Sequence, residues 1–235
     1  MANRRFALIA MIVGAIGVII GGYSIAVVSN TMLTNEANII EETNIDTNQL
    51  IIQGIDVSKG SPLLGDKDAP ITIIEFGDYQ CPRCDQWYLN QRPILEDKFI
   101  DTNNVNLYFL DFPFLGSDSF IAAEATYCAE EQGKYWEYHG ILYENQKGIN
   151  SGWANKDNLI KFAEELGLDI ESFKDCLDTG RYKDRVEYNK SIGLDNGVQR
   201  TPTFFIIDNI DNSVVKIVGA QPVEVFEKTI NAMLK

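Results

Sequence analysis

The sequence feature that most constrains the fold is a short apolar segment followed closely by a Cys-x-x-Cys motif. Ile71–Phe76 (ITIIEF) consists mainly of β-branched and aromatic residues, and this composition predicts a buried strand. Gly77 and Asp78 end the strand, and a Cys-Pro-Arg-Cys motif occupies residues 81–84. The sequence therefore predicts two sulfur atoms at the junction between a strand and a helix.

The residues of this motif favour a reactive sulfur. The sulfur of Cys81 would lie at a helix N-terminus, where unpaired N–H groups and the positive end of the helix dipole favour a thiolate. Cys84 follows one turn later, close enough to close a small disulfide. Pro82 suits the first helical turn because it lacks an N–H, and Arg83 adds a positive charge beside the same sulfur. We interpret the motif as a redox site and expect the pKa of Cys81 to lie below ~7.5.

Three other interpretations of the motif are weaker. A structural zinc site usually needs a second pair of Cys or His ligands, whereas the sequence has one His and only two further cysteines, Cys128 and Cys176, far apart. A purely structural disulfide between residues three apart closes almost no loop and stabilises little. A copper ion would require a third ligand, commonly His or Met, and none is close in the sequence. We therefore predict neither a metal nor a cofactor.

The N-terminal segment predicts a membrane anchor. Phe6–Val28 is an uncharged, mostly apolar run that is long enough to cross a bilayer as a helix. Arg4 and Arg5 precede it and the next basic residue is Lys59, so the positive-inside rule places the N-terminus in the cytosol and the remainder outside the cell membrane. A cleaved signal peptide is the alternative, but its apolar core usually has only ~7–15 residues.

The charge and the cysteines of the exported portion restrict its partners and its chemistry. The chain has 34 Asp and Glu residues against 20 Lys and Arg residues. This balance argues against nucleic acids and anionic lipids as partners, because both select basic surfaces. All four cysteines follow the predicted anchor, where thiols can pair, and their even number fits two disulfides.

The predicted elements divide the chain into five segments. Residues 1–28 are the cytosolic N-terminus and anchor, and residues 29–61 are an acidic linker in which Ile51–Val57 could form a short edge strand. Residues 62–115 and 197–235 contain the other strands, and residues 116–196 are helical in period. The predicted strands are Ile71–Phe76, Val105–Phe112, Thr203–Ile207 and Val214–Val218. The predicted helices are Asp85–Phe99, Phe120–Glu131, Tyr135–Tyr143, Lys156–Leu166, Ile170–Asp178, Arg181–Ile192 and Pro222–Met233.

This order of elements predicts an α/β fold. Without the helical block, the chain reads as a βαβ unit followed by a ββα unit, which together form one mixed sheet. Thr203–Ile207 and Val214–Val218 flank a polar turn and are predicted to form an antiparallel hairpin. Pro93 must kink or split the helix that follows the Cys-x-x-Cys motif.

Four segments together resemble a known family. They are IIEFGDYQCPRC, the FPF tripeptide after the second strand, CAEEQGKYWEYHGILYENQ, and GVQRTPTFFI near the C-terminus. The chain from about residue 61 onward resembles the DsbA-like thioredoxin-fold thiol–disulfide oxidoreductases, especially the membrane-anchored type of bacteria and archaea. The resemblance implies a thioredoxin fold with an inserted all-helical domain.

The resemblance also implies roles for individual residues. Cys81 resembles the exposed nucleophile of the family, and Cys84 resembles the buried resolving thiol. Thr201 and Pro202 resemble the cis-proline loop, which faces the Cys-x-x-Cys motif and pairs with an extended substrate. Glu75 matches an acidic residue beneath the disulfide, where burial would raise its pKa and let it relay the proton of the resolving thiol. Two alternatives stay open, because Pro202 could simply begin a strand and Glu75 could face solvent.

The remaining cysteines and the single histidine are weaker candidates. Some relatives carry a structural disulfide in the helical block, and Cys128 and Cys176 are the candidates for it here. The alternative is two buried, reduced thiols that act as small apolar residues. His139 could pair with a nucleophilic cysteine, but its aromatic neighbours favour a packed, hydrogen-bonded histidine.

The resemblance implies an exported, membrane-tethered enzyme that oxidises the free thiols of exported proteins. It further implies a quinone-coupled membrane protein as the reoxidant. A disulfide isomerase or a reductase would use the same site, so these alternatives stay open at the level of the sequence. A copper-handling protein is a more distant alternative.

Overall fold

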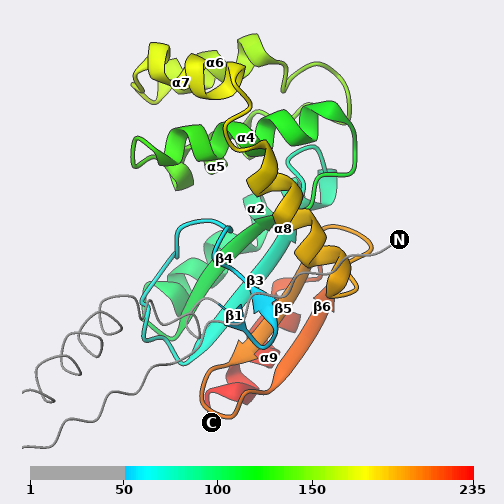
Figure 1. Cartoon of the computed structure of the whole chain (residues 1–235). Coiled ribbons are helices and arrows are strands. Elements are labelled where there is room, and N and C mark those ends of the chain that lie inside the picture. Colours follow the sequence, from blue (N-terminus) through cyan, green and yellow to red (C-terminus); the bar gives the residue numbers. More distant parts are fainter. Residues whose placement is uncertain (1–50) are drawn as a thin grey trace, which may run out of the picture. The chain divides into compact units, whose positions relative to one another are not determined.

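The computed structural model describes residues 51–235, and its centre is a four-stranded mixed sheet (Figure 1). The strand order is β4-β3-β5-β6. β3 (Ile71–Gly77) pairs parallel with β4 (Val105–Asp111) and antiparallel with β5 (Thr203–Asp208), which pairs antiparallel with β6 (Val214–Val218). The predicted βαβ and ββα units in one mixed sheet are thus confirmed.

One face of the sheet is covered by helices from both halves of the fold. They are α2 (Pro82–Asn90), α3 (Arg92–Leu95), the π-helical turn η2 (Glu96–Ile100) and α9 (Val223–Met233). The single helix predicted between β3 and β4 is split, as Pro93 requires, because its ring has no N–H for the helical ladder. Apolar residues of these helices pack on β3 and β5 and form one hydrophobic core.

Residues 51–57 differ from the prediction of a short edge strand. They form a separate two-stranded antiparallel hairpin of β1 (Ile51–Ile52) and β2 (Ile55–Asp56). Gly54, with a φ of +83°, allows the tight turn between them. The free edge of β4 is instead bridged by Leu64. The hairpin packs on the opposite face of the sheet from α2 and α9, where Ile55 is buried.

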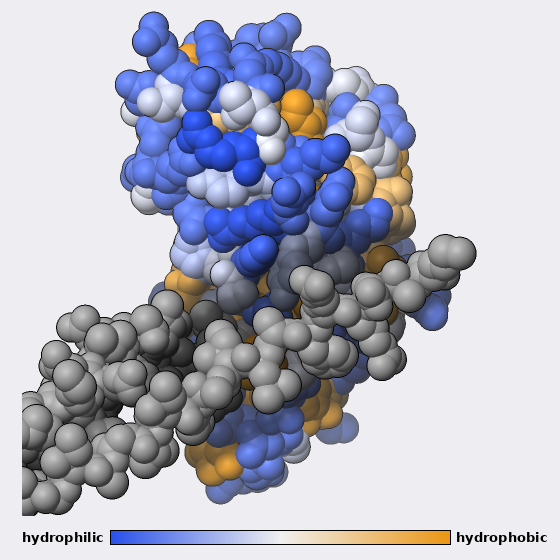
Figure 2. All heavy atoms as spheres, viewed as in Figure 1, coloured by the Kyte–Doolittle hydropathy of each residue, from blue (hydrophilic) through white to orange (hydrophobic). Residues whose placement is uncertain are grey.

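The helical block between β4 and β5 contains five helices. They are α4 (Ser117–Glu130), α5 (Tyr135–Glu144), α6 (Lys156–Glu165), α7 (Ile170–Asp178) and α8 (Lys183–Asp195). The bounds of α7 agree with the sequence, and the carboxylate of its N-cap residue Asp169 accepts a hydrogen bond from the Ser172 N–H at 2.8 Å. The outward face of α6 and α7 is mainly hydrophilic (Figure 2), because their apolar residues point into the core of the insertion.

A buried polar network joins this insertion to the sheet. The hydroxyl of Tyr127 on α4 donates to the carboxylate of Asp111 at the end of β4. Asn189 on α8 donates to the same carboxylate at 3.1 Å, and the Arg185 guanidinium lies 3.7 Å from the centre of the Tyr127 ring and donates to the Gly60 carbonyl. Burial raises the pKa of Asp111 to about 6. The insertion is therefore held at one end of β4 by charge-assisted hydrogen bonds.

The predicted anchor, Phe6–Val28, lies outside the described residues, and so does most of the predicted linker. Within residues 51–235, no helix is long and apolar enough to span a membrane. The anchor therefore stays a prediction from the sequence.

Candidate active site

The two cysteines of the Cys-x-x-Cys motif lie at the start of α2, directly after the turn that follows β3. Cys81 is the N-cap residue of α2, and its N–H donates to the Asp78 carbonyl at 2.9 Å. Cys84 lies one turn later and is fully buried. Both are free thiols. Only 6% of Cys81 is exposed, less than the family resemblance implied, because the chain at Thr201 packs against its sulfur.

The surroundings of Cys81 stabilise a thiolate. The pKa of Cys81 is lowered to about 6, first by a hydrogen bond from the Cys84 thiol, while burial opposes this shift. The Thr201 hydroxyl and the backbone N–H groups of Cys84 and Arg83 lower it further. These N–H groups are the unpaired donors of the first turn of α2. At neutral pH, Cys81 is therefore mostly a thiolate.

Arg83 acts differently from the sequence interpretation. Its guanidinium donates to the side chain of Gln86 at 2.7 Å, and both side chains are exposed. Arg83 lowers the pKa of Cys81 through a hydrogen bond from its backbone N–H. Its charge, which the sequence analysis placed beside the sulfur, is therefore directed along the helix surface. Pro82 occupies the first turn of α2, as expected.

Cys84 and Glu75 form the buried part of the site. Burial raises the pKa of Cys84 well above its ordinary value, and the hydrogen bond to Cys81 acts in the same direction. Glu75 on β3 is 2% exposed, and its Oε2 has no hydrogen-bond partner among the described residues. Burial raises the pKa of Glu75 to about 8, although the charge of Arg92 lowers it. Glu75 is thus a buried carboxyl and does not face solvent.

The loop before β5 faces Cys81. The peptide bond between Thr201 and Pro202 is cis, and Pro202 directly precedes β5. The carbonyl oxygen of Thr201 lies 3.5 Å from the Cys81 sulfur. The hydroxyl of Thr201 is buried and has no hydrogen-bond partner among residues 51–235, so it is available to a thiolate. The structure therefore brings Cys81, Cys84 and Thr201 together, with Glu75 buried near Cys84.

Asp78 positions the turn before Cys81, a function that the sequence analysis did not assign. Its Oδ1 accepts from the Gln80 N–H at 2.9 Å, and its Oδ2 accepts from the Phe114 N–H at 2.9 Å. Aspartate directly after a strand commonly forms such local turns. The sequence therefore carried an indication of the turn, but not of the contact with the segment after β4.

Three hydrogen bonds of glutamine side chains attach the same turn to the insertion, and the sequence did not indicate them. The side chain of Gln146, just after α5, donates to the carbonyls of Tyr79 at 2.7 Å and Cys81 at 3.1 Å. The side-chain oxygen of Gln80 accepts from the Asn150 N–H at 2.7 Å. These contacts join segments that are far apart in the sequence, and a lone glutamine in a loop gives no indication of its partner.

His139 is a packed residue beneath this turn. Its Nδ1 lies 2.9 Å from the Tyr79 hydroxyl, and it is surrounded by aromatic rings, including those of Phe109 and Trp136. Burial lowers the pKa of His139 well below its ordinary range, so the ring is neutral. The interpretation as a hydrogen-bonded core histidine agrees with this environment.

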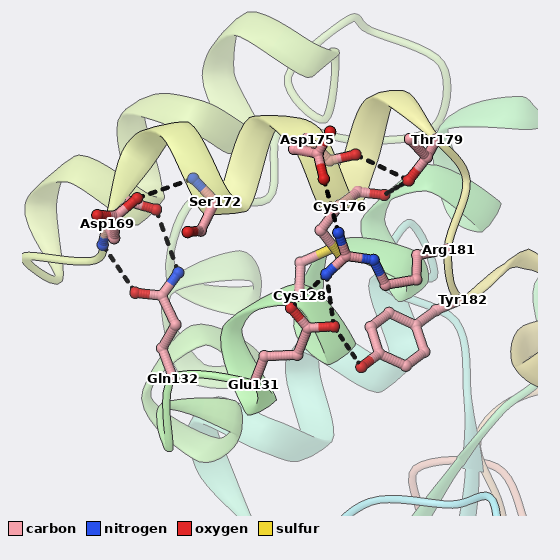
Figure 3. A network of polar contacts seen from close by, with 10 residues as sticks. All are labelled: Cys128, Glu131, Gln132, Asp169, Ser172, Asp175, Cys176, Thr179, Arg181 and Tyr182. Atoms are coloured by element: carbon pink, nitrogen blue, oxygen red, sulfur yellow. Dashed lines mark hydrogen bonds and ion pairs between the residues drawn. A yellow bond between two sulfur atoms is a disulfide. The ribbon is translucent and has the colours of Figure 1, made fainter.

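Cys128 and Cys176 form a disulfide that joins α4 to α7 (Figure 3). Both cysteines are buried. At the surface beside them, the Arg181 guanidinium contacts Glu131 at 2.6 Å and Asp175 at 2.7 Å. The same two helices are therefore connected by a covalent bond inside and by an ion-pair network outside.

Comparison with known proteins supports the same assignment of fold and chemistry. Residues 57–232 match a family model described as thioredoxin. A "Probable disulfide bond formation protein D" of Bacillus cereus is 34% identical over 153 residues, which are 63% of this chain and 71% of that protein. The "Disulfide bond formation protein D" of Bacillus subtilis is 32% identical over 155 residues, 65% of this chain and 70% of that protein.

Solved structures with the same fold extend this similarity. The oxidised BdbD of Bacillus subtilis is 28% identical, with a TM-score of 0.67 over 76% of this chain and 95% of that one. The alpha-DsbA1 of Wolbachia pipientis is 27% identical, with a TM-score of 0.66 over 73% of this chain and 89% of that one. The chain therefore belongs to the DsbA-like family of thioredoxin-fold disulfide bond formation proteins and is a thiol–disulfide oxidoreductase.

Proposed function

We propose that this chain is a dithiol oxidase that introduces disulfides into exported proteins, with Cys81 as the nucleophile and Cys84 as the resolving thiol. The observation that carries the proposal is the opposite acidity of two thiols three residues apart. The pKa of Cys81 is lowered to about 6, whereas burial raises that of Cys84 well above its ordinary value. In such a pair one defined sulfur, that of Cys81, serves both as the nucleophile and as the leaving group.

The first step forms a mixed disulfide. A substrate thiolate attacks the Cys81 sulfur of the Cys81–Cys84 disulfide, a substrate–Cys81 bond forms, and the Cys81–Cys84 bond breaks. The electron pair of the broken bond leaves with Cys84, which then takes a proton. Glu75 is the candidate donor, because with a pKa of about 8 it is mostly protonated at neutral pH.

The second step releases the oxidised substrate. A second substrate thiolate attacks the substrate sulfur of the mixed disulfide, and Cys81 leaves as a thiolate. The substrate has then lost two electrons and two protons. The protein holds the electrons in the Cys84 thiol and the Cys81 thiolate. The two substrate protons pass to solvent, and Glu75 regains from solvent the proton that it gave to Cys84. We expect the Thr201 carbonyl, 3.5 Å from the Cys81 sulfur, to accept a hydrogen bond from an extended substrate backbone, as the family resemblance implies.

The stabilised thiolate supports the oxidising direction. Stabilising the reduced form of a dithiol raises its reduction potential and makes its disulfide a stronger oxidant. A disulfide isomerase would use the same two sulfurs, and so would a reductase. A measured potential near that of thioredoxin, ~−270 mV, would favour a reductase over the oxidase proposed here.

The proposed location is outside the cytosol, with the catalytic domain tethered by Phe6–Val28 through the acidic linker. Residues 62–115 and 197–235 would form the redox domain, and residues 116–196 its helical insertion. Tethering keeps the domain close to other membrane proteins, which fits electron transfer to a quinone-coupled reoxidant. The relatives named as disulfide bond formation proteins support this cellular role.

A trapping experiment tests the proposal. In a Cys84→Ser variant of the full chain, the serine cannot resolve a mixed disulfide, so partners stay bound to Cys81. After acid quenching and alkylation, we expect adducts on a non-reducing gel that contain exported proteins and a membrane reoxidant. The Cys81→Ser/Cys84→Ser double variant is the matched control and should carry none. A folded Cys84→Ser variant without adducts would count against the oxidase function.

A further inference from the structure

Arg92, the first residue of α3, is a buried arginine close to the redox site. Only 5% of it is exposed, and arginine is almost never this buried unless it is paired. Its Nε donates to the Glu96 carboxylate at 2.8 Å, but its Nη1 is buried without a hydrogen-bond partner among residues 51–235. A half-satisfied guanidinium in the interior costs free energy, which calls for a function beyond the ion pair with Glu96.

The guanidinium is fixed in place by two aromatic rings. It lies 5.0 Å from the ring centre of Tyr88 on α2 and 4.8 Å from that of Trp136 on α5. Tyr88 in turn stacks on Tyr143 of α5, with ring centres 5.0 Å apart. Cys84 and Tyr88 are four residues apart on α2 and lie along one side of that helix, and Arg92, at the start of α3, contacts Tyr88.

Arg92 and Glu75 lie on the same side of the sheet. Glu75 alternates along β3 with Ile71 and Ile73, which belong to the core beneath α2 and α3, and Trp136, against the Arg92 guanidinium, packs on the same core. The other buried ionisable groups of this region are Cys81 and Cys84 at the start of α2 and His139 and Tyr143 on α5. Arg92 is the cation whose charge acts on Glu75, where it opposes the effect of burial and of Cys81. The same charge lowers the pKa of His139 and so helps to keep that ring neutral. The charge of Arg92 thus acts on Glu75, the carboxyl that is proposed to exchange a proton with Cys84.

We propose that Arg92 is a positioning residue of the Cys81–Cys84 site: through its charge it keeps Glu75 able to accept the proton of Cys84 when the pair is reoxidised. The inference rests on the proposed function. In that step the Cys84 thiol loses its proton to Glu75, and its sulfur attacks Cys81 in a mixed disulfide with an oxidant. The Cys81–Cys84 bond forms, the oxidant–Cys81 bond breaks, and the oxidant leaves as a thiolate that carries the electron pair.

Reoxidation by oxidised glutathione isolates this step. The Cys81 thiolate first forms a glutathione mixed disulfide, and attack by Cys84 then releases a second glutathione. Acid-quenched samples of the reduced full chain, separated by mass, give the decay rate of the mixed disulfide at each pH. In Arg92→Met the pKa of Glu75 rises further, so we expect the rate–pH midpoint to move up by at least ~0.5 unit, about a threefold loss of rate below it.

Three variants separate the charge of Arg92 from its packing. Arg92→Lys keeps the charge and should restore the midpoint, whereas a purely structural role would require the guanidinium. Lys98→Met removes a surface charge of the next helical turn, paired with Glu227 at 2.5 Å, and should leave the midpoint unchanged. In a Glu75→Gln background, Arg92→Met should add no further shift, because the group through which it acts is gone.

The measurements distinguish a failure of the role of Arg92 from a failure of the proposed function. A wild-type chain that forms no mixed disulfide at Cys81 would contradict the proposed function itself. A wild-type chain that reacts normally, together with an Arg92→Met midpoint equal to the wild type, would contradict the role of Arg92. An additional shift by Arg92→Met in the Glu75→Gln background would also contradict it. If Arg92→Met does not fold, Arg92→Gln, which can still bond to Glu96, takes its place with the same expected shift.

Discussion

The two cysteine pairs of this protein lie at opposite ends of their helices. Cys81 is the N-cap residue of α2, where first-turn N–H groups donate to its sulfur. Cys128 and Cys176 are each in the last turn of a helix, α4 and α7, where the negative end of the dipole disfavours a thiolate. All four cysteines are largely buried, so burial does not single out Cys81. The comparison shows that the hydrogen bonds to its sulfur do, first from the Cys84 thiol and then from the first-turn N–H groups.

The two pairs also differ in how much chain they enclose. Cys81 and Cys84 are three residues apart, so a disulfide between them closes a minimal loop and restricts the unfolded chain little. Cys128 and Cys176 are 48 residues apart, and their bond restricts most of the helical insertion. One pair is thus suited to exchange electrons at small conformational cost, and the other to hold α4 and α7 together.

The largest expected effect is on activity. Cys81→Ser should lower the oxidation rate of a dithiol peptide to the uncatalysed rate, because no other sulfur of the described structure is placed to form the mixed disulfide. The Cys128→Ser/Cys176→Ser variant should keep most of the rate, measured by the loss of free thiols. A Cys81→Ser variant that retains catalysis would remove the distinction between the two pairs.

The second effect is on stability. Loss of the Cys128–Cys176 bond should lower the free energy of unfolding by roughly 4 kcal/mol at most, the chain-entropy value for a loop of this length. Loss of the Cys81–Cys84 bond by Cys84→Ala should have a much smaller effect through loop closure, when the variant is compared with the oxidised wild-type protein. Urea denaturation followed by circular dichroism measures both. Equal losses for the two pairs would contradict the assignment of the second pair as structural.

The third effect is on the pH dependence of the thiols. Alkylation of reduced Cys81 should have a midpoint near pH 6, whereas Cys84 should react only far above its ordinary pKa. Because the folded pKa of Cys81 lies below the model-compound value of 9.0, its ionisation stabilises the folded, reduced protein. This contribution is complete above pH 9.0 and is lost as the pH falls through about 6. A midpoint near 8.5 for Cys81 would refute the activated thiolate.

Much of the fold follows from the sequence because its strands are strongly apolar and its helices are clearly bounded. β3 is recognised by its β-branched residues, and α7 by its N-cap aspartate and following glycine. The hairpin of residues 51–56 could not be predicted in the same way. Its strands are two residues long, too short to show an alternation of apolar and polar residues. Their position is determined by packing against the sheet.

The candidate site is predictable only where its residues carry a local pattern. The cysteines, Pro202 and Glu75 belong to motifs or to an apolar strand in which they stand out. Gln146 and Arg92 do not, because their effects depend on tertiary contacts that bring α5 and its following loop against α2. A charged residue in a helical pattern is usually exposed, so burial of Arg92 could not be inferred before the packing of α5 was known.

A smaller effect is expected at Glu75, the buried carboxyl beside the reactive pair. Here one substitution should change stability and reactivity in opposite directions. Its folded pKa of about 8 lies above the ordinary value of 4.5, so its ionisation opposes folding. This penalty is absent below pH 4.5 and grows until about pH 8. Glu75→Gln should therefore raise the melting temperature at pH 8 but not at pH 4, with roughly 2–4 °C expected per kcal/mol. It should also slow reoxidation. A lower melting temperature at pH 8 would contradict the buried, unpaired carboxyl.

The smallest effect is expected at Arg83, and it tests whether N–H groups or a side-chain charge activate Cys81. The guanidinium is exposed and bonded to Gln86, so solvent and salt screen its field at the sulfur. Arg83→Ala keeps the N–H and should shift the alkylation midpoint of Cys81 by less than ~0.5 unit. Arg83→Glu should shift it only slightly more, and by an amount that decreases with added salt. If Arg83→Glu raised the midpoint by a full unit at physiological salt, the charge would be a main cause of the activation. The contrast with Cys128 and Cys176 would then rest on a neighbouring side chain, and no longer on the helix N-terminus that those two cysteines lack.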